Sequence, residues 1–340
     1  MPYASGRANV VDHTAVALTD RPLVSVVVPV YNGGDYLAEC LESVVAQDYE
    51  TWDCTIVDNA SNDGTAEIAA RFAARDSRIR HLRFDAHVDV TANHNRAFDA
   101  ISEGSEFCKV VQADDWMYPE CLTRMVAAAG VADTVGTVSS YQLWGRRVHL
   151  QGLPYDVTFA PGREILRRTL LGEFHPTGGP TATMLRSAFV RERQPFYVEG
   201  FRHEDVEAAL WMLSRYDFAF VHQVLTFARQ QPGARWGRSE AMNAAAAEDV
   251  VFLLRYGPAV LEEGEYRARL RELLWRYLRW HIRRAPQLSR LRDPEFFAFH
   301  RLKREQILAE AHGEPEVTAA MAVLGALLAR DRLVPRVARY

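Results

Sequence analysis

The sequence predicts an α/β fold in which helices flank a mostly parallel sheet, followed by a helical C-terminal extension. Residues 23–30 read LVSVVVPV, and a strand that is apolar at nearly every position is typical of a parallel sheet buried on both faces. Short apolar strands then alternate with helix-length segments, which indicates βαβ units. Beyond about residue 240 the pattern is helical to the end.

Local signals place the elements in order. The sequence YNGG ends the first strand, and Asp35 is a suitable cap for a helix over residues 35–46. Pro119 suits the first turn of a later helix. The predicted strands are 23–30, 54–57, 79–84, 107–112, 137–143, 181–185 and 218–224, and the predicted helices are 35–46, 65–75, 91–101, one from 119, 162–171 and 205–215.

Length and composition bound the domain organisation and exclude several classes. The 340 residues suit a loose leader over 1–22, an α/β domain over 23–240 and a helical extension over 241–340. A hydrophobic content of 48% excludes a disordered chain, and a net charge of −4 argues against a nucleic-acid partner. Scattered cysteines and no signal-peptide pattern predict reduced thiols and a cytoplasmic protein.

Polar clusters follow three of the predicted strands. They are Tyr31-Asn32, Asp58-Asn59 and Asp114-Asp115. Because ligands of open α/β sheets bind at the carboxyl ends of the strands, we expect these clusters to form one site.

Taken singly, these clusters leave two interpretations open. Asp114-Asp115 is either a site for Mg²⁺ or Mn²⁺, which prefer hard oxygen ligands, or a solvated turn. Asp58 either accepts a hydrogen bond from a pyrimidine N–H or forms an Asx turn before the next helix.

Two later segments each allow two interpretations. Asp205, preceded by Glu204, is either a general base or an acid that complements a helix dipole. Residues 230–239 (QQPGARWGRS) predict a mobile loop in which Arg235 and Arg238 either clamp a diphosphate or are simply exposed.

The order of the motifs carries more information than any one of them. SVVVPVYN (25–32), VDNASNDGT (57–65), ADD (113–115) and ED (204–205) together resemble the successive motifs of family-two inverting glycosyltransferases with the GT-A fold. The resemblance covers about residues 22–240.

The resemblance implies a nucleotide pocket in which Pro29 and Tyr31 line the base. Asp58, or its neighbour Asn59, would hydrogen-bond the pyrimidine. His94 stands where the family often has an arginine, and it is expected at the same pocket.

The resemblance also implies the catalytic parts. Asp114 would face the ribose, Asp115 would hold Mn²⁺ or Mg²⁺ on the diphosphate, and Asp205 would be the catalytic base. The chain departs from the family pattern at Gln112, where a first acid is common, and at Gln231, where a histidine is common. Acceptor-binding residues are expected near 175–181 and in the C-terminal extension.

The implied activity is a metal-assisted, inverting transfer from a UDP- or dTDP-sugar to an acceptor hydroxyl. The acceptor class stays open among a saccharide, a lipid-linked acceptor and a small molecule. One alternative is a catalytically inactive nucleotide- or carbohydrate-binding protein of the same fold. Another is a sugar nucleotidyltransferase, although its G-x-G-T-R loop is missing after the first strand.

Residues 265–284 form an amphipathic, arginine-rich helical pattern. One interpretation is a helix that lies on an anionic membrane, which would suit a lipid-linked acceptor and a peripheral location at the inner membrane face. The other is a helix that packs on the catalytic domain with its arginines in solvent.

Overall fold

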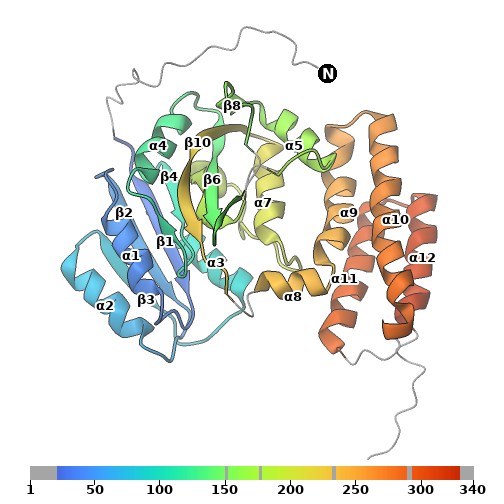
Figure 1. Cartoon of the computed structure of the whole chain (residues 1–340), viewed down its shortest axis with the longest axis horizontal. Helices are drawn as coiled ribbons and strands as arrows, with labels where there is room; N and C mark the ends of the chain where they lie inside the picture. Colours follow the sequence, from blue (N-terminus) through green and yellow to red (C-terminus); the bar gives the residue numbers. More distant parts are fainter. Residues whose placement is uncertain (1–20, 150–151, 176–177, 232–234, 289–292, 330–340) are drawn as a thin grey trace, which may run out of the picture. The chain divides into compact units, whose positions relative to one another are not determined.

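The computed structural model describes residues 21–149, 152–175, 178–231, 235–288 and 293–329 (Figure 1). Nearly all of the predicted leader therefore lies outside the described residues. The chain divides into a sheet unit, Met1–Glu199 with Glu204–Gln231, and a helical unit, Gly200–His203 with Pro232–Tyr340.

The sheet unit contains one mixed sheet with the strand order β3-β2-β1-β4-β9-β6-β10-β5. The first four strands in this order are parallel, as predicted, and β6 and β10 form a second parallel pair. β9 runs antiparallel to both of its neighbours and joins the two parallel blocks. The strands are β1 Val24–Val30, β2 Trp52–Asp58, β3 Ile79–Arg83, β4 Phe107–Val110, β5 Trp116–Met117, β6 Val135–Trp144, β7 Arg147–His149, β8 Phe159–Ala160, β9 Thr183–Arg186 and β10 Asp217–Ala228.

Sequence analysis missed β5, β7 and β8. These strands span only two or three residues, so no alternation of apolar residues marks them. They form because a neighbouring strand of the folded sheet offers backbone partners: β5 and β8 pair with β10, and β7 pairs with β6.

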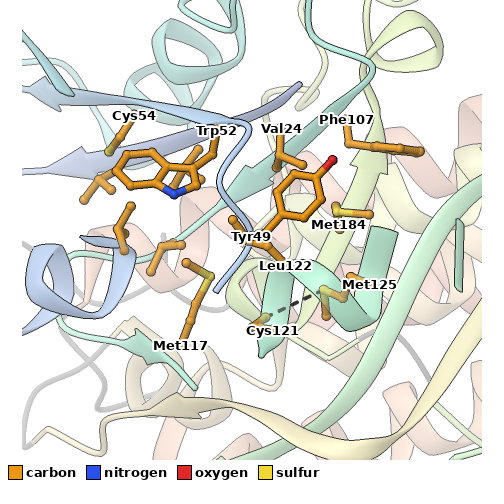
Figure 2. Close-up of a cluster of buried hydrophobic side chains, with 14 of the residues drawn as sticks. Val24, Tyr49, Trp52, Cys54, Phe107, Met117, Cys121, Leu122, Met125 and Met184 are labelled. Carbon is orange, nitrogen blue, oxygen red and sulfur yellow. Dashed lines mark hydrogen bonds between the residues drawn. The ribbon is translucent and has the colours of Figure 1, made fainter. Parts of the chain in front are cut away.

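Two layers of helices cover the parallel strands, and β1 shows how one strand serves both. Val26, Val28 and Val30 pack with residues of α1, α2 and α4, whereas Val27 packs with residues of α3, α6 and α7. Figure 2 shows part of the first of these cores, around Trp52 and Met125. The helices of this unit are α1 Leu37–Val45, α2 Thr65–Arg75, α3 Val90–Asp99, α4 Cys121–Ala129, α5 Gly162–Leu170, α6 Ser187–Val190 and α7 Glu204–Leu213, with the 3₁₀ turn η1 Pro180–Ala182.

Two local predictions about this unit meet different outcomes. The N-cap residue of α1 is Tyr36, and it makes no side-chain capping bond, so the predicted cap at Asp35 is wrong. Pro29 does lie inside the central strand β1, although it has no N–H to donate. The strand tolerates the missing donor because the backbone of residue 29 points toward β4, as that of Val27 does. β1 pairs with β4 only as far as Val27, so no ladder hydrogen bond is lost.

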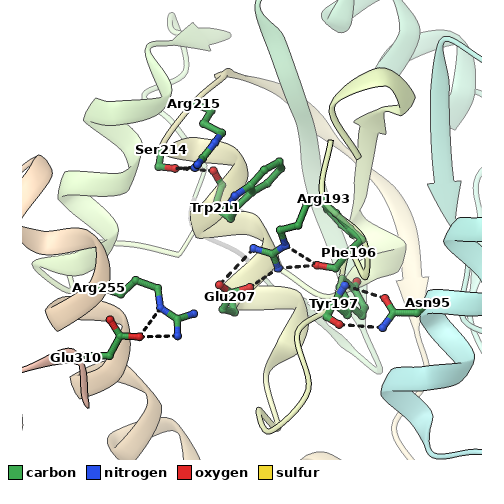
Figure 3. Close-up of polar contacts among 10 residues, drawn as sticks. All are labelled: Asn95, Arg193, Phe196, Tyr197, Glu207, Trp211, Ser214, Arg215, Arg255 and Glu310. Atoms are coloured by element: carbon green, nitrogen blue, oxygen red, sulfur yellow. Dashed lines mark hydrogen bonds and ion pairs between the residues drawn. The ribbon is translucent and has the colours of Figure 1, made fainter. Parts of the chain in front are cut away.

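The helical unit is a bundle. Its helices are α8 Arg235–Ala241, α9 Ala244–Tyr256, α10 Glu263–Leu288, α11 Pro294–Glu310 and α12 Pro315–Ala329, with the 3₁₀ turn η2 Gly257–Ala259. The guanidinium of Arg255 donates two hydrogen bonds to Glu310, 2.9 and 2.7 Å long, which join α9 to α11 (Figure 3). No helix among the described ranges is long and apolar enough to cross a membrane.

The predicted amphipathic helix is α10, and it packs against α9 and α12. Its apolar residues Tyr266, Leu270 and Tyr277 are buried. On the outer face, Arg271 pairs with Glu316 at 2.9 Å and Arg276 pairs with Asp249. Residues 265–284 therefore pack within their own helical unit rather than on the sheet domain, while Trp275 and Ile282 of the same helix are exposed, so the membrane interpretation stays a prediction.

Two histidines in the core of the helical unit should make its stability depend on pH. His281 donates from Nδ1 to the carbonyl of Tyr277 at 3.0 Å, and the Tyr277 hydroxyl lies 2.7 Å from Nδ1 of His300. Burial lowers the pKa of His281 to about 4 and the pKa of His300 well below its usual value. An unfolded histidine titrates near 6.5, so below that pH the unfolded chain binds more protons than the folded one.

We therefore expect the free energy of unfolding to fall as the pH is lowered from about 6.5 toward 4, with His281 contributing roughly 2–4 kcal/mol over that range. Urea unfolding of the full chain at several pH values, followed by tryptophan fluorescence, measures this. His281→Gln should flatten the dependence, because glutamine takes up no proton. An unchanged pH slope in that variant contradicts the assignment.

Candidate active site

The turns after β1 and β2 are joined by hydrogen bonds at the carboxyl edge of the sheet. The backbone N–H of Asn32 donates to the Ser61 hydroxyl, and the Asn32 side-chain oxygen accepts from the N–H of Asn62, both at 3.0 Å. Asn32 adopts a positive φ of 52°, which asparagine tolerates better than most residues. The third polar turn lies beside the first: a Cβ atom on Gly33 of the first turn would lie 3.6 Å from the Cβ of Ala113 in the third. The predicted convergence of the three polar turns is therefore confirmed.

Asp58 ends β2 with its side chain fully buried. One carboxylate oxygen accepts from the N–H of Ser61 at 2.9 Å. The other has no hydrogen-bond donor among the described residues; Nε2 of His81 is 3.5 Å away and Nε of Arg83 is 3.8 Å away. A buried oxygen with spare acceptor capacity suits a base N–H, and a base reaches it only if one of these two side chains moves aside.

Tyr31 is half exposed and stands beside His87, with 4.3 Å between the two ring centroids. Such an aromatic pair offers a stacking surface for a base. Asn59 holds the loop that carries His87: its side chain donates to the carbonyl of Val88 at 2.8 Å and accepts from the N–H of Val88 at 2.9 Å. Its side-chain oxygen also accepts from Arg96 at 3.0 Å, so Asn59 supports the pocket through this loop. No motif marked His87 in the sequence.

Asp114 and Asp115 follow β4, as predicted, and their carboxylates are held by protein donors. The Thr181 hydroxyl donates to Asp115 at 2.7 Å, and the backbone N–H of Arg229 donates to its other oxygen at 3.0 Å. The side-chain amide of Gln231 donates to Asp114 at 2.9 Å.

Burial and mutual repulsion oppose ionisation of this pair. Burial raises the pKa of Asp115 to about 7, with a further contribution from the charge of Asp114. Burial also raises the pKa of Asp114. A divalent cation would offset this cost, because its charge favours the ionised form of both carboxylates.

The donor set fits a hard cation. Each oxygen of Asp115 accepts one hydrogen bond from the protein, and a carboxylate oxygen has two lone pairs, so one remains for a metal. Magnesium-like cations usually take one or two carboxylates and complete their shell with water and substrate phosphates. No cluster of three or more acidic, histidine or cysteine side chains that could hold a metal occurs in the part of the chain that the structure describes.

Thr181 and Arg229 were not singled out as partners of this pair from the sequence, and Gln231 was noted only as the position where the family often has a histidine. Thr181, Arg229 and Gln231 come from segments that follow Asp115 by at least 60 positions, and only the pairing of β9 and β10 into the sheet brings them there. His94 is buried, with Nε2 3.0 Å from the side-chain nitrogen of Gln112.

Asp205 lies in the first turn of α7 and lines a pocket in the sheet unit. The lining also includes Gly179, Pro180, Thr183 and Tyr197, so part of the segment where acceptor residues were expected is at this pocket. Glu204 is buried and is not part of the lining. Of the two acids, Asp205 is therefore the one that a ligand in the pocket would meet.

Hydrogen bonds hold the segments that line the pocket in place. Asn95 of α3 exchanges two hydrogen bonds of 2.8 Å with the backbone of Tyr197, and Arg193 donates to Glu207 of α7 at 2.5 Å (Figure 3). The wall and the helix that carries Asp205 are thus both tied into the sheet unit.

The two arginines predicted at a diphosphate have different outcomes. The predicted loop is helical from residue 235 onward, as α8, and the side chain of Arg235 lies outside the described part of the structure. Arg238 pairs with Asp293 at 2.6 Å and with Glu295 at 2.9 Å inside the helical unit. Two carboxylates already balance the charge of Arg238, so this conformation does not support its diphosphate role.

Known proteins resemble the chain in sequence. Residues 25–193 match the family described as Glycosyl transferase family 2. The chain is 36% identical over 93 residues to the glycosyltransferase GlyG of Streptococcus pneumoniae, covering 27% of this chain and 30% of GlyG. It is 27% identical over 225 residues to the putative glycosyltransferase EpsE of Bacillus subtilis, covering 62% of this chain and 79% of EpsE.

Solved structures share the fold. Residues 1–349 of TarS from S. aureus, in complex with UDP-GlcNAc, superpose with a TM-score of 0.61 at 18% identity, covering 91% of this chain and 90% of that one. The mannosyltransferase PcManGT of Pyrobaculum calidifontis, in complex with GDP-Man and Mn²⁺, gives a TM-score of 0.52 at 18% identity, covering 92% and 81%. The sheet with its flanking helices is thus of the GT-A type, and through residues 25–193 the chain belongs to glycosyltransferase family 2.

Proposed function

We propose that this protein transfers a sugar from a UDP- or dTDP-sugar to an acceptor hydroxyl, with inversion at the anomeric carbon and with help from Mn²⁺ or Mg²⁺. The observation that carries the proposal is the adjacent pair of the half-buried Asp114 and the buried Asp115 at the carboxyl edge of the sheet, whose charge calls for a cation. The UDP-GlcNAc bound to TarS and the GDP-Man and Mn²⁺ bound to PcManGT support a nucleotide-sugar donor and a divalent metal.

The base of the donor would stack on Tyr31 and His87, which form the half-exposed aromatic pair. Its N–H would reach the buried oxygen of Asp58. Asp114 would face the ribose and Asp115 would hold the metal. When bound, the cation neutralises the negative charge that develops on the leaving nucleoside diphosphate.

Asp205 would take the proton from the acceptor hydroxyl. The acceptor oxygen forms its bond to the anomeric carbon on the face opposite the nucleoside diphosphate, whose bond to that carbon breaks. The acceptor hydroxyl would approach Asp205, the carboxylate in the lining of this small pocket, whose other lining side chains are apolar or hydroxyl-bearing.

A catalytically inactive nucleotide-binding protein is the second candidate, favoured by the way His81 and Arg83 cover Asp58. A screen of donor hydrolysis across UDP-, dTDP- and GDP-sugars separates the two. Turnover of one donor, dependent on Mn²⁺ or Mg²⁺, supports the transferase. Nucleotide binding without turnover of any donor, even with added acceptors, supports the inactive protein.

Asp58→Ala should weaken UDP binding by about 1–3 kcal/mol, which is roughly 5–150-fold, because the base N–H then loses its buried acceptor. Calorimetry with UDP, dTDP and GDP measures this. Asp53→Ala is the matched control: it removes a carboxylate from the same strand, where Asp53 accepts a hydrogen bond from Ser25, and should leave UDP affinity unchanged. Tighter binding of GDP than of UDP and dTDP contradicts the pyrimidine assignment.

A further inference from the structure

Lys109 is one of the two lysines in the sequence and is fully buried in β4. Its ammonium donates to the backbone carbonyl of Thr181 and, at 3.0 Å, to the carbonyl of Thr183. A buried ammonium is costly unless it is well hydrogen-bonded. Lys109 therefore holds the backbone by two hydrogen bonds at the point where the turn η1 leads into β9.

The turn held by Lys109 presents the Thr181 side chain to the metal-site carboxylate. The hydroxyl oxygen of Thr181 accepts from the backbone N–H of Gln112 at 3.1 Å, so its own proton is directed to Asp115, 2.7 Å away. Thr181 is 1% exposed, so water does not compete for this bond. Thr181 thereby fixes one oxygen of Asp115, while the N–H of Arg229 fixes the other.

The same turn also forms part of the wall beside Asp205. Gly179, Pro180 and Thr183 line that pocket, whereas the Thr181 side chain points away from it, to Asp115. One short segment, anchored by one buried cation, therefore borders both the metal carboxylate and the pocket of the predicted base.

We propose that Thr181 is a positioning residue for the metal-binding carboxylate of Asp115, and that Lys109 holds Thr181 in place. The inference rests on the proposed metal site. It assigns no contact with the metal to either residue: Thr181 acts on the carboxylate, and Lys109 acts on the backbone of Thr181. Removing an outer hydrogen-bond partner of a metal ligand typically lowers metal affinity by about 10–100-fold.

The test is calorimetric titration of UDP with and without Mn²⁺, which needs neither donor turnover nor an identified acceptor. In the wild type, Mn²⁺ should increase the affinity for UDP. Thr181→Val keeps the shape and removes the hydroxyl, and it should raise the Mn²⁺ concentration needed for this increase about 10–100-fold. It should leave metal-free UDP binding unchanged, and Thr181→Ser should restore the wild-type value.

Matched variants separate this role from general destabilisation. Thr55→Val also removes a buried hydroxyl of the same sheet, which accepts a hydrogen bond from Arg80, and it should leave the Mn²⁺ requirement unchanged. Lys109→Met should raise the requirement at least as much as Thr181→Val. The double variant should need no more Mn²⁺ than Lys109→Met alone, because Lys109 acts on Asp115 only through Thr181.

Each failure has its own meaning. If Mn²⁺ has no effect on UDP binding by the wild type, the proposed metal site is overturned, and this inference with it. If wild-type binding responds to Mn²⁺ and Thr181→Val responds equally, the metal site stands and the positioning role is overturned. If Thr55→Val shifts the Mn²⁺ requirement as much as Thr181→Val, the effect is general destabilisation and the inference is likewise overturned.

Discussion

Asp115→Asn should lower kcat by about 100-fold or more, because the asparagine cannot supply the negative charge that holds a divalent cation against the diphosphate. The variant should fold normally. An asparagine keeps the shape of the side chain, and its amide oxygen can still accept from the N–H of Arg229. The measurement is turnover of the donor identified by the hydrolysis screen, with thermal unfolding as the check on folding.

Chelation provides the parallel measurement on the wild-type protein. EDTA should abolish turnover, and Mn²⁺ or Mg²⁺ should restore it. Asp133→Asn, which changes an exposed carboxylate of the same unit, should behave like the wild type in both experiments. Full turnover of Asp115→Asn, or full turnover of the wild type in excess chelator, would remove the metal from the proposed function.

Asp205→Asn should lower the transfer rate by roughly 10²–10⁴-fold, the usual contribution of a positioned general base. A hydroxyl is a weak nucleophile at neutral pH, and asparagine keeps the shape of the side chain without its basicity. Nucleotide affinity should stay nearly constant, because the base acts in the transition state and not on donor binding. The two quantities to compare are the transfer rate and the affinity for UDP.

Glu204→Gln is the matched control for the neighbouring acid. Glu204 is buried and does not line the pocket, whereas Asp205 does, so the control should be milder in its effect on rate. An inactive Glu204→Gln together with an active Asp205→Asn would identify Glu204 as the base. A parallel loss of rate and UDP affinity in Asp205→Asn would mean that this residue shapes the donor pocket.

The parallel half of the sheet could be predicted because its signals are local. The unbroken apolar run in β1 reflects burial on both faces, with Val26 and Val27 in opposite cores. The turn after β2 was equally readable, since Asp58 accepts from the N–H of Ser61 three residues on, as the Asx-turn interpretation of this segment expects. Such patterns need only neighbours in the sequence, which a single chain provides.

The helical unit shows the limit of local pattern. An arginine-rich helix with an apolar stripe has the same sequence signature whether it meets a membrane or other helices. In the structure α10 packs against α9 and α12, and Leu270 and Tyr277 are buried within the helical unit. Likewise, the glycine and two arginines of residues 235–238 suggested a loop, but the segment folds as α8 and Arg238 finds carboxylates at Asp293 and Glu295.

By itself, the sequence determined which acids stand at the ends of the strands, and therefore the family and the edge of the sheet where its chemistry belongs. Tertiary structure alone decided what surrounds those acids: Thr181 and Arg229 on Asp115, Lys109 beneath the turn, and His87 beside Tyr31. The physical reason is the range of the forces involved. Strand and turn signals arise between residues a few positions apart, whereas burial and hydrogen bonding of a carboxylate depend on segments that only the folded sheet brings together.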